Sequence, residues 1–257
     1  MGKEPYLDPY IFTALGGLLG LLAGIALNRI SYYLPIILER QWQAEAQSAL
    51  GLYHADNSPH GWSELFAPIP AKSVLRPPVV AIGASLASML VAWHFGPTTP
   101  ALPAIFLTWC LLTLSLIDGE HQLLPDVVVM PFLWLGLAVN TFGLFTGLSD
   151  ALWGAIWGYL SLWLVYWAYK LTSGREGLGY GDFKLFAMIG AWCGWQVLPL
   201  CMLIAAAAGS VSIIVLRCLG KSSSNAVIPF GPFLAAGGWV SLLWGNEAIS
   251  AYLSLLG

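Results

Sequence analysis

The chain has 257 residues, of which 58% are hydrophobic and 9% are charged, and its formal net charge is -3 at pH 7. Charged residues make up roughly a quarter of an ordinary soluble domain, so the composition excludes that class and indicates a polytopic membrane protein. The sequence contains no basic run, which argues against a nucleic-acid partner and leaves the lipid bilayer as the expected surroundings.

Long uncharged runs mark the predicted membrane-spanning helices, because a helix needs about 20 apolar residues to cross a bilayer. In chain order they cover residues 9–28, 77–95, 101–117, 127–149, 151–169, 185–216 and 226–246. The run at 185–216 is too long for one ordinary span, and Gln196 and Pro199 interrupt it. We therefore predict two helices there and an all-α fold of about eight transmembrane helices.

The basic residues predict the topology. With eight spans, nine of the ten lie on one side and only Lys3 lies on the other, and an excess of Lys and Arg marks the cytoplasmic side. The nine are Arg29, Arg40, Lys72, Arg76, Lys170, Arg175, Lys184, Arg217 and Lys221. The same count places Asp118, Asp126 and Asp182 on the cytoplasmic side, where they can face one another.

The segment between the first two predicted spans is the only sizeable polar piece of the chain. Residues 38–50 favour a helix, and the part after them is typical of a loop. Fewer than about 50 residues with little apolar content cannot form much of a hydrophobic core alone. We therefore expect this segment to pack against the helices or the membrane surface. We divide the chain into a first transmembrane helix (1–28), a cytoplasmic segment (29–76) and a transmembrane domain (77–257).

Two acidic clusters interrupt the apolar chain, one from Asp118 to Asp126 and one at Asp182. Placing an ionisable group at membrane depth costs free energy, so such groups are usually paired, hydrated or part of a functional site. Two neighbouring carboxyl groups share a proton, so one can act as a base toward water while the other donates to a carbonyl. That arrangement hydrolyses a peptide bond without a metal. These considerations do not choose between Asp118 and Asp126 as the partner of Asp182.

Two glycines, Gly179 and Gly181, flank Tyr180 just before the second acid. They give the backbone freedom to bend and leave room for an extended substrate strand. The four-residue G-x-G-D pattern recurs by chance, and by itself it is equally typical of a turn where a chain leaves the membrane.

Three sequence motifs taken together favour a functional role for the G-x-G-D run over a simple turn at the membrane edge. They are Leu-Ser-Leu-Ile-Asp118 and its continuation to Asn140, the G-x-G-D-x-K run at 179–184, and Ile-Pro-Phe-Gly-Pro at 228–232 with the following glycines. In this order and spacing they resemble the type IV prepilin leader peptidases, over residues 77–245. The resemblance implies an aspartic protease of the bacterial inner membrane that cleaves the basic leader of prepilins and pseudopilins on the cytoplasmic side, after a glycine. The apolar N-terminal helix of the substrate would lie in the bilayer.

The resemblance also implies roles for single residues. The family pattern makes Asp118 and Asp182 the catalytic pair of the peptidase domain, with no cofactor for the cleavage. The supporting residues are Asp126, Gly179, Gly181 and Lys184. Lys184 would orient Asp182 or mark the membrane interface. Glu120 and His121 are expected to be solvated loop residues.

Family members often also methylate the new N-terminal amine with S-adenosylmethionine, an activity linked to the segment after the first helix. Here the likeness is partial, because residues 38–45 and the Asn28 and Leu34-Pro35 element match but Tyr33 stands where the family has an arginine. The two zinc-binding C-x-x-C pairs of longer members are absent, so zinc is not expected. The cytoplasmic segment is therefore interpreted as a reduced methyltransferase-like region, with methyl transfer left open and no cofactor-binding residue assigned.

Two alternatives remain open. Presenilin-like proteases also use a G-x-G-D aspartate, although they are usually longer and carry a different first-aspartate motif. A transporter or a non-catalytic assembly factor could use the acids to bind a cation or a proton, although the spans show no internal repeat of the kind many transporters carry.

Overall fold

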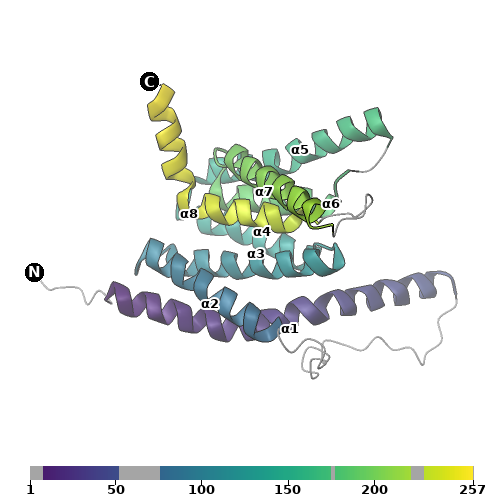
Figure 1. Cartoon of the computed structure of the whole chain (residues 1–257), viewed down its shortest axis with the longest axis horizontal. Helices are drawn as coiled ribbons and strands as arrows, with labels where there is room; N and C mark the ends of the chain where they lie inside the picture. The colour runs from purple at the N-terminus through teal and green to yellow at the C-terminus, as the bar shows by residue number, and fades with distance from the viewer. Residues whose placement is uncertain (1–7, 52–75, 175–176, 221–228, 257) are drawn as a thin grey trace, which may run out of the picture.

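The structure is a computed structural model that describes residues 8–51, 76–174, 177–220 and 229–256. Within these ranges it contains eight α-helices and no strand (Figure 1). They are α1 (Pro9–Ala49), α2 (Arg76–Phe95), α3 (Ala101–His121), α4 (Asp126–Asn140), α5 (Leu148–Ser173), α6 (Tyr180–Cys193), α7 (Leu198–Cys218) and α8 (Gly231–Leu256). The all-α fold class is confirmed, and so is the predicted break of residues 185–216 into two helices.

The described helices include four that are long and apolar enough to cross a membrane, namely α1, α2, α3 and α7. This is the composition of a polytopic membrane protein. That all eight helices span the bilayer stays a prediction, as does the division of the chain at residues 28 and 76.

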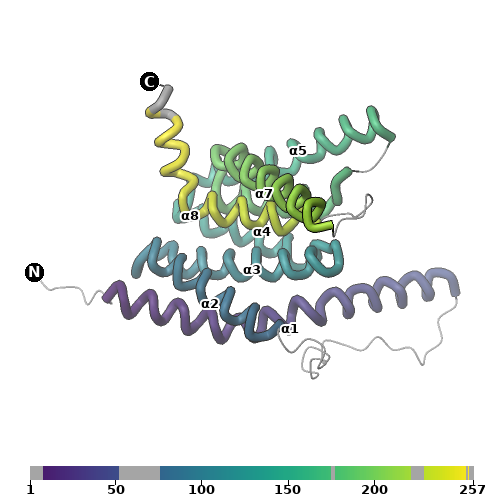
Figure 2. Tube along the Cα trace, in the orientation of Figure 1, coloured from purple at the N-terminus to yellow at the C-terminus, as the bar shows by residue number. Residues whose placement is uncertain are grey.

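Helix α1 is much longer than the predicted first span. It begins where the Asp8 side chain accepts a hydrogen bond from the Tyr10 amide at 2.9 Å, with Pro9 at the first helical position. Its 41 residues reach about 60 Å at 1.5 Å per residue, roughly twice the thickness of the hydrocarbon core. The part after residue 28 is therefore a helical extension, which Figure 2 shows projecting beyond the start of α2. The rest of the predicted cytoplasmic segment, from residue 52 to 75, lies outside the described residues.

Helix α4 is shorter than the predicted span at 127–149, because the chain turns around a buried amide. The Asn140 side chain is 1% exposed. Its Nδ2 donates to the carbonyl oxygens of Ala191 and Trp192, both at 2.9 Å. Its Oδ1 accepts from the amides of Phe145 and Thr146. These bonds end α4 at Asn140 and tie its end to the end of α6, which a count of apolar residues could not show.

Glycines allow the helix pairs to touch, as small residues do at helix interfaces in membranes. A Cβ atom at Gly20 of α1 would lie 2.5 Å from the carbonyl oxygen of Ala84 in α2. A Cβ atom at Gly154 of α5 would meet the backbone carbonyl of Gly190 in α6 even more closely. Gly20 and Gly154 are therefore positions where two helices pack closely.

We expect Gly154→Ala to destabilise the protein by about 1–3 kcal/mol, the usual range for overpacking, because the new methyl group has no room beside α6. Thermal unfolding of the purified protein in detergent measures this. Gly83→Ala in α2 is the matched control, since no heavy atom lies within 4 Å of the added Cβ. Equal midpoints for the two variants would contradict the close contact of α5 and α6.

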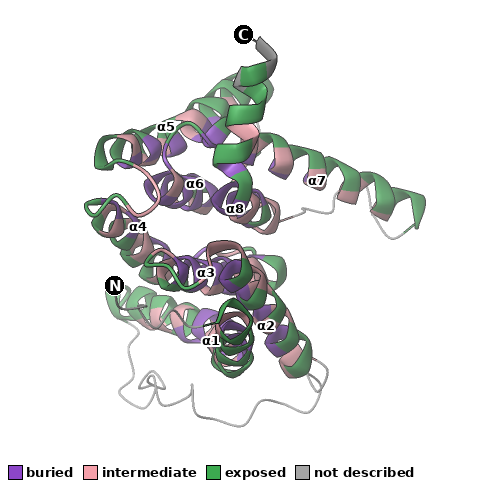
Figure 3. Ribbon diagram, turned by 90° about the vertical axis from the view of Figure 1, so that its left-hand side faces the viewer, coloured by how far each residue is buried: buried purple, intermediate pink, exposed green. Residues whose placement is uncertain are grey.

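The order of packing brings two helix ends together. Helix α3 packs against α1, α2 and α8, and α6 packs against α4, α5 and α8. Figure 3 shows that α3 and α6 carry much of the buried surface. The C-terminal end of α3 and the N-terminal end of α6 consequently meet at one end of the molecule.

Candidate active site

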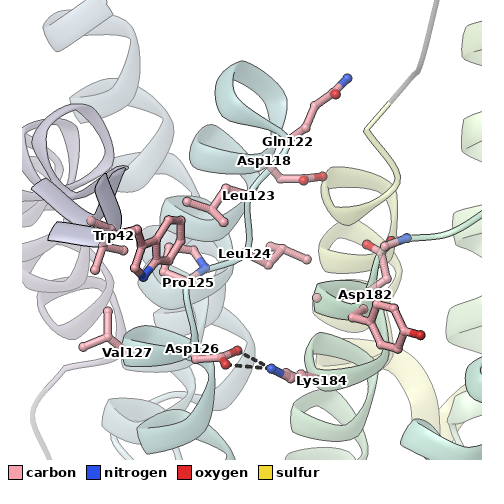
Figure 4. A pocket seen from close by; sticks show the side chains of 14 residues that line it. Trp42, Asp118, Gln122, Leu123, Leu124, Pro125, Asp126, Val127, Asp182 and Lys184 are labelled. Carbon is pink, nitrogen blue, oxygen red and sulfur yellow. Dashed lines mark hydrogen bonds and ion pairs between the residues drawn. The ribbon is translucent and has the colours of Figure 1, made fainter. Parts of the chain in front are cut away.

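A cavity of about 470 Å³ lies where these two ends meet. Its wall includes Asp118 from the last turn of α3, Asp126 from the start of α4 and Asp182 from the first turn of α6. The extension of α1 contributes Leu38 and Trp42. Figure 4 shows Asp118 and Asp182 on opposite sides of the space between α3 and α6, with the Asp118 carboxyl group directed at the start of α8. The fold thus places both predicted catalytic acids in one cavity.

Asp118 is held by the beginning of α8. Its side chain is 6% exposed, and its Oδ2 accepts a hydrogen bond from the Gly231 amide at 2.9 Å. The N-terminal end of a helix carries a partial positive charge that favours a carboxylate beside it. A Cβ atom at position 231 would lie 2.6 Å from the same oxygen, so only glycine lets this amide approach so closely.

Asp182 occupies the third position of α6 and is 7% exposed. Its Oδ2 accepts a hydrogen bond from the Gly179 amide at 3.2 Å. This is one half of a capping box, and Gly179 has no side chain to return the other half. Burial, and after it the charge of Asp118, raises the pKa of Asp182 to about 7, while the hydrogen bond from Gly179 acts in the opposite direction. Asp182 therefore holds a proton up to neutral pH.

Asp126 and Lys184 form an ion pair, with Nζ 2.6 Å from Oδ2. Lys184 therefore binds Asp126, and the dashed lines in Figure 4 show both of its bonds to that carboxylate. The Asp126 side chain is 59% exposed, whereas Asp118 is buried and its charge acts on Asp182. The geometry thus favours Asp118 over Asp126 as the partner of Asp182. The chemistry of the acidic residues in the sequence did not distinguish the two.

The two glycines of the G-x-G-D run line the cavity, but the expected freedom of the backbone to bend is not what they provide. Gly179 has φ -81° and ψ 147°, which any residue adopts, and Gly181 lies inside α6. What requires a glycine is packing, because a Cβ atom at position 181 would lie 2.8 Å from the Cβ of Leu124. Gly181 brings the start of α6 against the loop between α3 and α4.

Glu120 and His121 are not loop residues, contrary to the expectation. They form the last turn of α3, which ends at His121. Glu120 Oε2 lies 3.0 Å from Nη1 of Arg76, the first residue of α2. This ion pair fastens the start of α2 to the end of α3 beside the cavity.

Sequence reasoning missed three residues that contribute to the site, namely Gly231, Leu38 and Trp42. Gly231 belongs to a quoted motif, but its spacing cannot reveal a bond to a side chain 113 residues earlier in the chain. Nothing in the sequence indicates that Leu38 and Trp42 line the cavity. Within the described residues, no group of three or more His, Cys, Asp or Glu side chains is placed to hold a metal ion.

Comparisons with known proteins agree with these features. The type IV leader peptidase family matches residues 105–214. The chain is 45% identical to a prepilin leader peptidase/N-methyltransferase of Pseudomonas putida, over 98% of this chain and 97% of that protein. It is 46% identical to the protein of the same name from Pseudomonas aeruginosa, over 97% and 96%, and 39% identical to that of Aeromonas hydrophila, over 96% and 95%. No solved structure is a significant match to the chain.

Proposed function

Because the chain belongs to the type IV leader peptidase family, we propose that it is a membrane aspartic endopeptidase that cleaves prepilins and pseudopilins after a glycine. Asp118 and Asp182 are its catalytic pair in this proposal. The observation that carries it is the single cavity that both carboxyl groups line. The name shared by the relatives supports the prepilin substrate over a presenilin-like protease or a transporter.

The two acids receive different tasks in the proposed mechanism. Burial raises the pKa of Asp118, and the hydrogen bond from the Gly231 amide at the N-terminal end of α8 acts in the opposite direction. Because the charge of Asp118 contributes to the raised pKa of Asp182, Asp118 is the ionised member of the pair and takes a proton from the attacking water. Asp182 has a pKa of about 7 and donates its proton to the carbonyl oxygen of the scissile peptide. The tetrahedral intermediate then collapses: Asp118 gives the proton that it took from water to the leaving amine, the C–N bond breaks, and Asp182 takes back a proton from a hydroxyl group of the intermediate. Neither acid forms a covalent bond with the substrate.

The proposal predicts an activity that falls at alkaline pH. The raised pKa means that Asp182 is protonated below about pH 7 and loses its proton above that value. Above it, we expect the rate to fall about tenfold for each pH unit, because the proton donor is lost. Initial cleavage rates in liposomes measured across neutral pH test this. A rate that keeps rising into the alkaline range would assign the chemistry to another base.

We place the protein in the bacterial inner membrane with the cavity facing the cytoplasm. Arg76 begins α2, Lys184 lies near the start of α6 and Arg217 lies in the last turn of α7. Arg76 is tied to the end of α3 and Lys184 lines the cavity. A surplus of Lys and Arg at this end supports the cytoplasmic orientation.

N-methylation of the new N-terminus, with S-adenosylmethionine as methyl donor, is a second part of the proposal. Its support is the name of the relatives. In the described part of the methyltransferase-like region, Glu39, Arg40 and Glu45 are exposed on α1 and do not line the acidic cavity. No residue is therefore assigned to the cofactor.

Mass spectrometry of a prepilin incubated with the purified protein in liposomes tests both parts at once. Loss of the leader mass reports peptide cleavage, and the gain of one methyl group, only when S-adenosylmethionine is added, reports methyl transfer. An unchanged prepilin mass under conditions in which the protein is folded would refute the proposed function.

A further inference from the structure

A second cavity, of about 190 Å³, lies between α2, α3 and α8. Its floor is the α3 face that carries Thr108, Leu111 and Ser115, and its walls include Ala87 of α2 and Ala236 of α8. We refer to this cavity as the α2–α8 groove. The proposed peptide cleavage in the acidic cavity does not involve this groove.

The α2–α8 groove begins next to Asp118, which lines the acidic cavity. Residues 108, 111, 115 and 118 of α3 are spaced by three or four, so they lie on one face of the helix. Asp118 is therefore the next side chain along the floor of the groove. On α8, Pro232 lines the groove and follows Gly231, whose amide binds Asp118. A chain that leaves the acidic cavity past Asp118 along this face of α3 reaches the groove.

The groove accepts apolar groups only. Thr108 Oγ1 donates to the Ala104 carbonyl at 2.8 Å and accepts from Trp239 Nε1 at 3.1 Å. Ser115 Oγ donates to the Leu111 carbonyl at 2.7 Å. The polar atoms of its floor are thus already bonded within the protein, and the remaining lining is apolar.

At the end of the groove away from Asp118, α2 and α8 contact each other. The His94 ring of α2 and the Trp244 ring of α8 lie edge to face, with centroids 5.9 Å apart. The helices that flank the groove therefore meet beyond it, and a segment lying in the groove extends from the acidic end. This gives the groove a direction, from Asp118 into the membrane-spanning part of α3.

The lining and position of the groove indicate which kind of segment can bind in it. A segment that continues from the cleaved bond into the bilayer must satisfy its own backbone hydrogen bonds, which makes it a helix. Small side chains at Ala87, Ser115 and Ala236 let such a helix approach closely. We infer that the α2–α8 groove docks the apolar helix that follows the cleaved bond of the substrate. This inference rests on the proposed function and adds the surface that selects the substrate.

Ala87→Phe and Ala236→Phe test the inference, because each adds a ring to the groove from opposite walls. For a prepilin that contains its apolar helix, we expect KM to rise about tenfold and kcat to change by less than about twofold, the pattern of lost ground-state binding. A peptide that spans the cleavage site and stops before the helix should be cleaved at the rate of the unaltered protein. Ala207→Phe is the matched control, since Ala207 is exposed on α7 and does not line the groove.

A second measurement does not depend on the folding of the Phe variants. Ala236→benzoylphenylalanine should cross-link to the substrate helix on illumination, and the same replacement at Ala207 should not. Equal effects of Ala236→Phe on both substrates, or no cross-link at 236 beside intact cleavage, would overturn the inference. If the unaltered protein cleaves neither substrate, the proposed function itself fails.

Discussion

Asp118→Asn and Asp182→Asn should each lower the rate of prepilin cleavage by about a thousandfold or more, with little effect on substrate binding. An asparagine amide fills the same space as the carboxyl group but neither takes a proton from water nor donates one as an acid does. Because both acids line one cavity, the loss of either removes one half of the proton transfer. Single-turnover cleavage in liposomes measures the effect without interference from product release.

Asp126→Asn is the matched control for this pair. Asp126 lines the same cavity, but its side chain is 59% exposed and is paired with Lys184. We expect its replacement to lower the rate by no more than about tenfold, since exposed ion pairs contribute little and the proton transfers do not involve it. A folded Asp118→Asn or Asp182→Asn variant that still cleaves prepilin would refute the assignment of the pair. A thousandfold loss in Asp126→Asn would make Asp126 a member of it.

Gly231→Ala should lower kcat by about a hundredfold, although the change is a single methyl group far from Asp118 in sequence. The new Cβ would lie 2.6 Å from Asp118 Oδ2 and 3.0 Å from its Cγ, so the carboxyl group has to move away from the Gly231 amide. A displacement of about 1 Å in a catalytic group can cost a factor of this size. The measurement is kcat and KM for cleavage, and KM should change little because Gly231 does not line the α2–α8 groove.

Gly119→Ala separates this effect from a general intolerance of alanine near the site. Gly119 follows Asp118 in α3, and a Cβ there has no heavy atom within 4 Å. Alanine also favours a helix over glycine, so we expect normal activity and equal or higher stability. Equal loss of activity in the two variants would contradict the positioning role of Gly231.

The acidic cavity also links two regions that the sequence treats as separate. Leu38 and Trp42 belong to the methyltransferase-like region, yet both line the cavity of the proposed peptidase. They reach it because α1 continues as one helix through the predicted boundary at residue 28. If methyl transfer takes place, the new N-terminus is released beside the segment linked to it.

Prediction from sequence succeeded where local composition decides the structure. Apolar runs locate the helices, and the polar residue and proline at Gln196 and Pro199 locate the break between α6 and α7. Prediction was less accurate where a distant group ends or extends an element. Helix α4 stops at Asn140 because the amide of Asn140 binds the end of α6, and the apolar residues after it gave no sign of this.

The motifs singled out Asp118 and Asp182, because the order and spacing of chemically unusual residues are properties of the chain itself. Only the tertiary structure decided what surrounds them. It placed the Gly231 amide on Asp118, paired Lys184 with Asp126 and formed an apolar groove between α2, α3 and α8. The physical reason is that hydrogen bonds, ion pairs and burial act between atoms a few ångströms apart, and in this protein those atoms come from helices far apart in the sequence.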